Sequence, residues 1–151
     1  MTIMTKPRLT PAGHRTIETM IRLAHCSKFH RIIVAGSNGP ERMFELHRRG
    51  FNRAASTTTC GLPHGQYDVA LVDWQLHSME ALEATLDWLV HFLAPGGVLV
   101  VCLNAAERLG RRKLSFILQR LGFRVEAGTC CEQGVIISAR RPDAIEQAIA
   151  A

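Results

Sequence analysis

The chain has 151 residues, enough for one domain with its own core, and its 47% hydrophobic and 21% charged residues are typical of a globular protein. No apolar run reaches the length of a membrane span, and the N-terminus lacks the apolar segment of a secretory signal, so we expect a cytoplasmic protein. The five cysteines lack the spacing of a zinc site or a disulfide framework, so we expect reduced thiols and no bound metal.

The net charge of +5 is unevenly distributed along the chain. Residues 1–53 contain ten Lys and Arg residues and three acidic ones, whereas residues 54–98 contain five acidic residues and no Lys or Arg. Such a basic segment suits an acidic partner or a nucleic-acid backbone. Because no aromatic residues alternate with these charges, we favour solvated faces of surface helices, and nucleic acid is not the favoured partner.

The N-terminal part predicts a leader, a helix and a strand. Residues 1–9 are expected to be flexible, and Thr10-Pro11 is a typical helix start, with an apolar stripe that continues to about Lys28. The apolar segment 31–35 predicts a short strand that runs into the turn Gly36-Ser37-Asn38-Gly39. A strand, a glycine turn and a helix in this order direct helix N–H groups at an anion or a ribose.

A second helix is predicted from Pro40 to Gly50, where glycine is a natural C-terminal cap, and a second strand is predicted over 51–56. The following segment, 57–66, is too short for a further helix and strand with their turns, and its Gly, Pro and Thr content predicts a loop.

The segment Tyr67–Leu103 predicts the centre of the domain. Two apolar runs, 69–72 and 98–103, flank a helix whose leucines repeat at the spacing of one helix face. Pro95-Gly96-Gly97 is predicted to stop this helix and turn the chain. Two non-alternating apolar runs joined by a helix predict a βαβ unit whose strands are buried on both faces.

The C-terminal part predicts a helix, capped by Asn104 and ended by Gly122, and an antiparallel pair of edge strands at 123–127 and 135–139. Residues 10–141 are therefore predicted to form a single domain, with residues 142–151 as a tail. The whole order predicts a doubly wound, three-layer α/β fold with a mostly parallel sheet and a C-terminal antiparallel hairpin, shortened around its second and third strands.

This order of parts resembles the class I S-adenosylmethionine-dependent methyltransferases from Thr10 to Arg140. The local matches are Tyr67-Asp68-Val69 followed by Leu76-His77, the "L-x-PGG" turn that begins at Leu93, and Leu121-Gly122-Phe123. The resemblance implies a Rossmann-like fold that binds S-adenosylmethionine, with cofactor contacts from the residues at the strand ends: Gly36, Ser37, Asn38, Gly39, Ser56, Asp73 and Trp74.

The chain departs from the family pattern at three cofactor contacts. The family's first loop reads acidic-x-G-x-G-x-G, but here Val34 stands at the acidic position and Asn38 replaces the second glycine. The second strand ends in Ser56-Thr57 without the carboxylate that accepts hydrogen bonds from the ribose hydroxyls. The third strand, which supplies an acidic residue near the adenine, is missing or reduced to part of 57–66.

Candidate catalytic residues follow the strand that faces a substrate in such sheets. His77 is a candidate general base near neutral pH, with Asp73 beside it, and Trp74 could line an aromatic or cationic pocket. The structural alternative is that Asp73 and Ser78 cap the next helix while Trp74 packs against it.

Val72–Met79 resembles the phosphoacceptor stretch of response-regulator receiver domains, "D-x-x-L-P-x-M". A receiver needs acidic residues after its first strand and a Lys after its fifth, and this chain has Ala35-Gly36 and Leu103-Asn104 at those places.

Two functions are favoured from the sequence, and a receiver-like domain is a remote alternative. The first is methyl transfer from S-adenosylmethionine to a small molecule. The second is a non-catalytic binding or regulatory module that kept the fold, acting on a protein partner through its basic N-terminal face or self-associating through a sheet edge left exposed by the missing strand.

Overall fold

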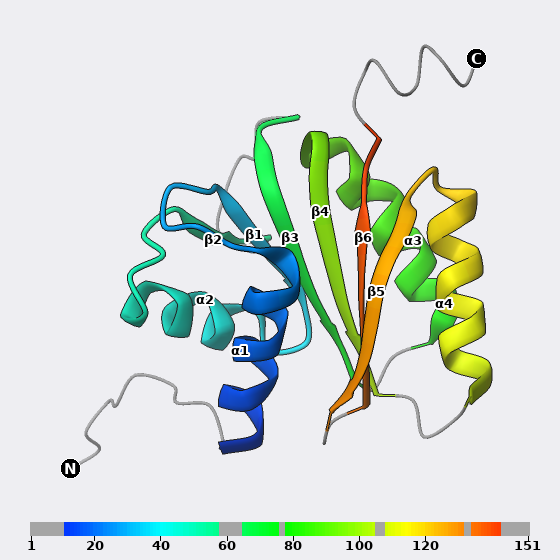
Figure 1. Ribbon diagram of the computed structural model, residues 1–151, viewed down its shortest axis with the longest axis horizontal. Helices are drawn as coiled ribbons and strands as arrows, with labels where there is room; N and C mark the ends of the chain where they lie inside the picture. Colours follow the sequence, from blue (N-terminus) through cyan, green and yellow to red (C-terminus); the bar gives the residue numbers. More distant parts are fainter. Residues whose placement is uncertain (1–10, 58–64, 76–77, 105–107, 132–133, 143–151) are drawn as a thin grey trace.

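The computed structural model describes residues 11–57, 65–75, 78–104, 108–131 and 134–142, and these form three layers with a sheet between two pairs of helices (Figure 1). The helices are α1 (Pro11–Ala24), α2 (Gly39–Arg48), α3 (Met79–Leu89), which continues into the short 3-10 helix η1 (Val90–Phe92), and α4 (Arg108–Arg120). The strands are β1 (Ile32–Gly36), β2 (Ala54–Ser56), β3 (Tyr67–Trp74), β4 (Leu93–Leu103), β5 (Arg124–Cys131) and β6 (Gly134–Arg140).

The strand order is β2-β1-β3-β4-β6-β5. The first four strands are parallel, and β6 runs antiparallel between β4 and β5. The register places Gly36 opposite Asp73 and Asp73 opposite Cys102, so the carboxyl ends of β1, β3 and β4 lie level at one edge of the sheet.

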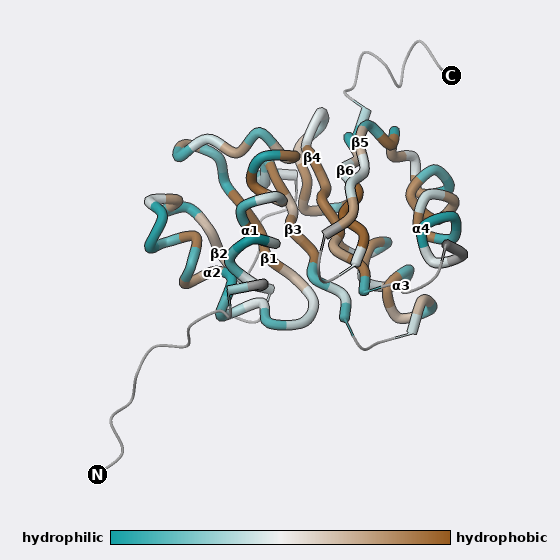
Figure 2. Tube along the Cα trace, turned by 60° about the horizontal axis from the view of Figure 1, so that its bottom comes forward, coloured by the Kyte–Doolittle hydropathy of each residue, from teal (hydrophilic) through white to brown (hydrophobic). Residues whose placement is uncertain are grey.

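Alternate residues of the buried strands fill two separate cores, as expected for strands covered on both faces. On one face Val34 and Leu71 pack with Ile17 and Met20 of α1 and Leu46 of α2. On the other face Leu82, Leu86 and Leu89 of α3 and Leu114, Ile117 and Leu118 of α4 cover residues that include Ile33, Val72 and Val101. Figure 2 shows the result, with hydrophobic strands at the centre and hydrophilic stretches on the helices outside.

The predicted α/β fold class is confirmed, including the βαβ unit and the antiparallel C-terminal hairpin. Several predicted boundaries were wrong. The first helix ends at Ala24, before its predicted end near Lys28. The third helix ends before Pro95, and Pro95-Gly96-Gly97 lies inside the irregular start of β4, where the pairing jumps from Tyr67–Leu93 to Val69–Val98. Strand β2 begins at Ala54 and not at residue 51, and β5 extends to Cys131, beyond its predicted end at residue 127.

Other predictions fall partly or wholly outside the described residues. The leader at 1–9 lies outside them, as does most of the tail at 142–151 and of the segment 57–66. No helix in the described part of the chain is long and apolar enough to cross a membrane. Among the described residues, Cys26, Cys102 and Cys130 form no disulfide bond, and burial raises the pKa of Cys26 to about 12.

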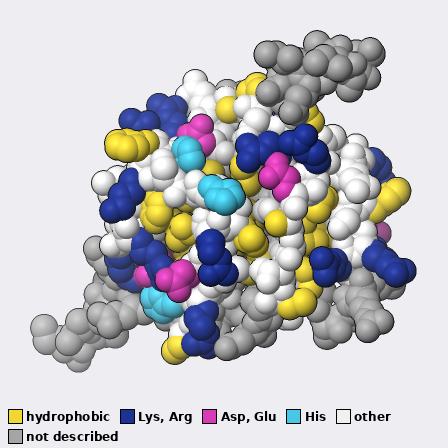
Figure 3. Space-filling view, in the orientation of Figure 1, with side chains coloured by type: hydrophobic (Ala, Val, Ile, Leu, Met, Phe, Trp, Pro, Cys, Tyr) yellow, Lys and Arg dark blue, Asp and Glu magenta, His cyan; other side chains and the backbone are white. Residues whose placement is uncertain are grey.

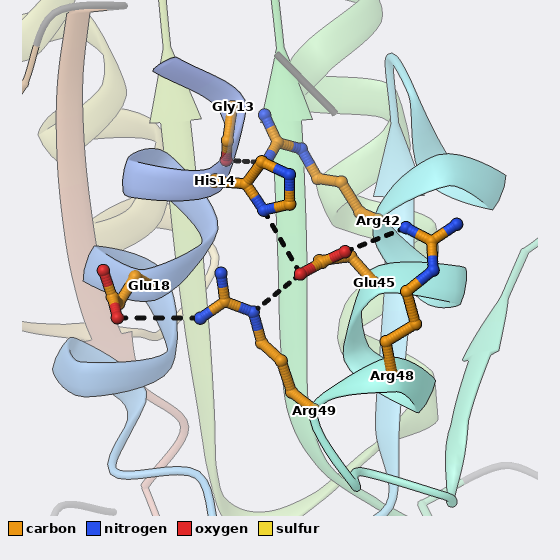
Figure 4. Close-up of polar contacts among 7 residues, drawn as sticks. All are labelled: Gly13, His14, Glu18, Arg42, Glu45, Arg48 and Arg49. Carbon is orange, nitrogen blue, oxygen red and sulfur yellow. Dashed lines mark hydrogen bonds and ion pairs between the residues drawn. The ribbon is translucent and has the colours of Figure 1, made fainter. Parts of the chain in front are cut away.

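A polar cluster joins α1 to α2 over the first core (Figure 4). Arg48 and Arg49 donate hydrogen bonds to the two carboxylate oxygens of Glu45, each at 3.0 Å, and His14 Nδ1 lies 3.2 Å from the same group. Burial of Glu45 opposes ionisation, but the hydrogen bonds from Arg49 and Arg48 and the charges of His14 and Arg49 outweigh it, so the pKa of Glu45 lies below its ordinary value of 4.5.

This lowered pKa predicts an acid-sensitive link between the two helices. The carboxylate of Glu45 contributes stability above about pH 4.5, and this contribution is lost as the pH falls through the lower pKa of the folded state. Urea unfolding between about pH 6 and about pH 3 should therefore show a smaller loss of stability in Glu45→Gln than in the unmodified protein. Glu18→Gln is the control, because it also removes a carboxylate near Arg49, at 3.7 Å, but one that is exposed to solvent. Equal pH dependence in the Glu45→Gln variant and the unmodified protein would contradict this role.

Candidate ligand-binding site

The carboxyl ends of β1 and β3 form the switch point of this sheet. The chain leaves β1 toward α2 on one face and leaves β3 toward α3 on the other, so the two connections diverge above neighbouring strands. Open α/β sheets bind ligands in the crevice that such a divergence creates. The predicted turn at 36–39 and the predicted residues at the end of β3 meet at this edge.

Gly36 ends β1 in close contact with β3. Its φ is +88°, and a Cβ atom at this position would lie 2.1 Å from the carbonyl oxygen of Asp73. The next residue, Ser37, donates its N–H to that same carbonyl oxygen at 2.6 Å. Glycine is therefore required here to let the two strand ends approach, whether or not a ligand binds.

Asn38 and Gly39 complete the turn. Asn38 adopts a left-handed conformation with φ 57° at the N-cap of α2, and its side chain makes no capping hydrogen bond. Gly39 is buried, but the nearest atom to an added Cβ would be the carbonyl oxygen of Val34 at 3.9 Å, which is an ordinary contact. The backbone therefore excludes a side chain at Gly36 but leaves room for one at Gly39.

Asp73 forms a buried ion pair with Arg42 of α2. Nε and Nη2 of Arg42 donate to Oδ2 of Asp73 at 2.9 and 2.7 Å, and the side chains of Arg42 and Asp73 are 1% and 0% exposed. Gln75 donates to Oδ1, and Nη1 of Arg42 reaches the carbonyl oxygen of Gly13 in α1 at 3.4 Å. Both carboxylate oxygens therefore face protein groups, and the geometry gives Asp73 a structural role that joins β3, α2 and α1.

Ser56 is 1% exposed and lies on the same face of β2 as Ala54, which packs in the α1–α2 core. The next residue, Thr57, donates its N–H to the carbonyl oxygen of Val34 and lines a surface pocket at the strand ends. Sequence reasoning selected Ser56, but the alternation of side chains along β2 places Thr57 on the pocket side.

That pocket, which we call the edge pocket, has a volume of about 430 Å³ and lies over the ends of β1, β2 and β3 beside α3. This volume is within the usual range for small-molecule sites. Trp88 is 46% exposed and is fixed by an edge-to-face contact with Phe92, the ring centroids being 4.6 Å apart. The described residues that line the edge pocket are Ala35, Gly36, Thr57, Trp74, Ala81, Thr85 and Trp88.

The remaining predicted residues divide between the pocket and the helix start. Ser78 caps α3 by accepting a hydrogen bond from the N–H of Ala81 at 3.1 Å, as the structural alternative expected. Trp74 packs in the α3–α4 core while donating its indole N–H to the carbonyl oxygen of Ser78, and part of it reaches the edge pocket. His77, the candidate general base, lies outside the described residues.

The edge pocket fits the adenosine part of S-adenosylmethionine better than its methionine end. Indole surfaces suit a planar adenine, and the hydroxyl groups of Thr57 and Thr85 can exchange hydrogen bonds with ribose hydroxyls. No carboxylate is present among the described lining residues to pair with the ammonium group of the methionine end. Sequence reasoning missed Ala81, Thr85 and Trp88, because nothing in a helical pattern shows which solvent-facing residues border a pocket.

The contrast between the two glycines of the turn gives a direct test. Gly36→Ala should lower the free energy of unfolding by more than about 2 kcal/mol, because the new methyl group would collide with the Asp73 carbonyl and φ is positive. Gly39→Ala should change it by less than about 1 kcal/mol. Chemical denaturation of the two variants measures both values, and similar effects at the two positions would contradict this account of the strand ends.

The ion pair predicts a distinctive double-mutant cycle. Arg42→Met leaves the buried Asp73 carboxylate without its cation and should cost about 3–5 kcal/mol of folding stability. Adding Asp73→Asn removes the stranded charge and should recover part of that loss, giving a coupling energy well above about 1 kcal/mol in urea unfolding. Additive effects of the two substitutions would show that the pair is not coupled.

Comparisons with known proteins agree with this architecture. No protein-family model matches the sequence, and no curated protein matches it. Among solved structures, the [4+2]-cyclase SpnF superposes with a TM-score of 0.69 at 12% sequence identity, covering 92% of this chain and 85% of that chain.

Two methyltransferases are similar to a comparable extent. The 1,6-didemethyltoxoflavin-N1-methyltransferase of Burkholderia thailandensis, whose structure contains S-adenosylhomocysteine, has a TM-score of 0.61 and 14% identity over 88% of this chain and 79% of that chain. The tRNA (m1A58) methyltransferase TrmI of Aquifex aeolicus has a TM-score of 0.60 and 11% identity over 95% of this chain and 73% of that chain. At such identities the likeness establishes the fold and not the activity. The chain therefore has the fold of the class I S-adenosylmethionine-dependent methyltransferases.

Proposed function

We propose that the chain binds S-adenosylmethionine in the edge pocket and transfers its methyl group to a small molecule. The observation that carries this proposal is the position of the pocket, over the ends of β1, β2 and β3 at the switch point of a methyltransferase-like sheet. Solved structures with this fold include a methyltransferase with S-adenosylhomocysteine bound.

In this proposal the residues of the edge pocket bind and orient the adenosyl group. Trp88 offers an indole face, held by its contact with Phe92, and Thr57 and Thr85 offer hydroxyl groups. The backbone of Gly36 lines the pocket beside these residues. When bound, the cofactor would supply an electrophilic methyl group on a sulfonium cation. His77 remains our prediction for the general base that would remove a proton from the acceptor.

A specific observation favours the alternative of a non-catalytic binding module. The carboxylate of Asp73, which the sequence suggested as a cofactor or catalytic group, forms its hydrogen bonds with Arg42 and Gln75. The end of β2 also lacks a carboxylate, since Ser56 is followed by Thr57, and this further reduces the polar contacts available to the cofactor. In this alternative the fold would bind a protein partner or a second copy of itself without methyl transfer.

The proposal is tested by filling the edge pocket from α3. Ala81 is exposed on the pocket side of this helix, and Ala84 is exposed but does not line the pocket. Calorimetric titration with S-adenosylmethionine and S-adenosylhomocysteine should show binding that Ala81→Trp weakens by about tenfold or more and Ala84→Trp leaves within about twofold. Both variants keep the buried leucines of α3, so they should fold alike.

Three results separate the candidates. Binding that responds to Ala81→Trp alone supports the proposed site, and methyl transfer from labelled cofactor to a screened acceptor then supports the enzyme. Binding without transfer to any acceptor supports the non-catalytic module. No binding of either ligand to the unmodified protein at millimolar concentration would overturn S-adenosylmethionine as the ligand.

A further inference from the structure

A second surface, at the other end of the sheet, carries concentrated positive charge. Between residues 108 and 125 the sequence contains six Lys or Arg residues and no Asp or Glu. Helix α4 presents much of this charge, and it packs against β5, the strand farthest from β2 and the edge pocket (Figure 1). We call Arg111, Arg112, Lys113 and Phe116 the α4 surface.

The cations of the α4 surface are available to an external partner. All three are exposed, and within the described part of the chain no ion pair involves them. The neighbouring cations differ, since Arg120 pairs with Glu83 and Arg124 lies 3.7 Å from Glu126. Lys and Arg side chains are also widespread on the face shown in Figure 3, which adds to the positive field around the molecule.

An aromatic ring lies among these charges. Phe116 is 63% exposed, although it belongs to a helix whose other large apolar residues with described side chains, Leu114, Ile117 and Leu118, are buried. The guanidinium carbon of Arg120 lies over one side of the Phe116 ring, 5.8 Å from its centroid, and Arg112 is one helical turn away. With 63% of its surface exposed, the ring still offers area on which a base could stack. A hollow of about 610 Å³ runs along this side of α4, lined by Arg111, Arg112, Ser115, Phe116 and Gln119.

The positive surface continues from α4 onto the edge of the sheet. Nη2 of Arg111 lies 3.1 Å from the position that a Cβ of Gly128 would occupy in β5. The glycine therefore leaves room for the guanidinium to lie against the strand. Cations and an aromatic ring thus share one surface that spans a helix and a neighbouring strand.

We propose that the α4 surface binds single-stranded RNA. Cationic side chains beside an exposed aromatic ring provide the two contacts such a ligand needs, namely ion pairs with phosphates and stacking on a base. A lipid surface suits the α4 surface less well, because a membrane-bound helix inserts a wide apolar face, and that face of α4 is buried in the core. This surface is distinct from the edge pocket, and the inference is independent of the proposed function.

The test uses a fluorescein-labelled oligouridine of about 15 nucleotides and the full chain, followed by fluorescence anisotropy at about 50 mM and about 200 mM salt. The triple variant Arg111→Gln, Arg112→Gln, Lys113→Gln should weaken binding by about tenfold or more. The slope of the logarithm of the binding constant against the logarithm of the salt concentration should become about 2 units less steep, because three phosphate contacts are lost. Phe116→Ala should weaken binding by about fivefold or more with little change in that dependence.

A charge-matched control removes three exposed cations elsewhere, through Arg22→Gln, Lys28→Gln and Arg53→Gln. If the RNA binds the α4 surface, this control should lose less than about threefold in affinity. Equal losses in the two triple variants would overturn the proposal, since binding would then follow net charge alone. The absence of RNA binding at about 50 mM salt, or binding to phosphatidylserine vesicles without RNA binding, would also overturn it.

Discussion

The buried ion pair between Arg42 and Asp73 anchors α1 and α2 to the central strand β3. It links the end of the central strand β3 to α2, and through the Gly13 carbonyl to the start of α1, in a region from which water is excluded. A charge buried this deeply is tolerated only when its partner is equally fixed, so the position of α2 over the sheet depends on it. The backbone of Asp73 adds a second constraint, since its carbonyl oxygen accepts the Ser37 N–H and occupies the space that any side chain at position 36 would need.

These constraints separate structural from ligand-binding roles at the strand ends. The side chains on the α1–α2 face, Asp73 and Ser56, are buried, whereas their chain neighbours Trp74 and Thr57 face the opposite side and line the edge pocket. A residue pattern that suggests a cofactor site can thus lie one position away from the residues that border the pocket. The edge pocket keeps the location that the fold favours for ligands, with hydroxyl and indole groups in its described lining.

Much of the fold could be predicted from sequence, because hydrophobic periodicity and turn residues act locally. The apolar runs of β3 and β4 with a leucine-striped helix between them identified the parallel unit, and the length of 57–66 indicated the shortened region. The residues of the site could be predicted less well from the sequence. Nothing near Asp73 in the sequence shows that Arg42, 31 residues away, neutralises it, and β2 was too short for its facing to be read from alternation. Trp88 was not selected because exposed aromatic residues on a helix have no local signature of a pocket.

Nuclear magnetic resonance would test most directly whether S-adenosylmethionine binds in the edge pocket and leaves the Arg42–Asp73 ion pair intact. The chain has two tryptophans, both lining the edge pocket, so their indole N–H resonances and the Nε–H resonance of Arg42 can be followed during a titration with S-adenosylmethionine. We predict that the Trp88 indole and the Gly36 and Thr57 amides shift in a saturable way, while the Arg42 Nε–H resonance stays in place. A titration in which the Arg42 resonance moves or disappears while the indole signals do not would contradict the account, since the cofactor would then compete for Asp73.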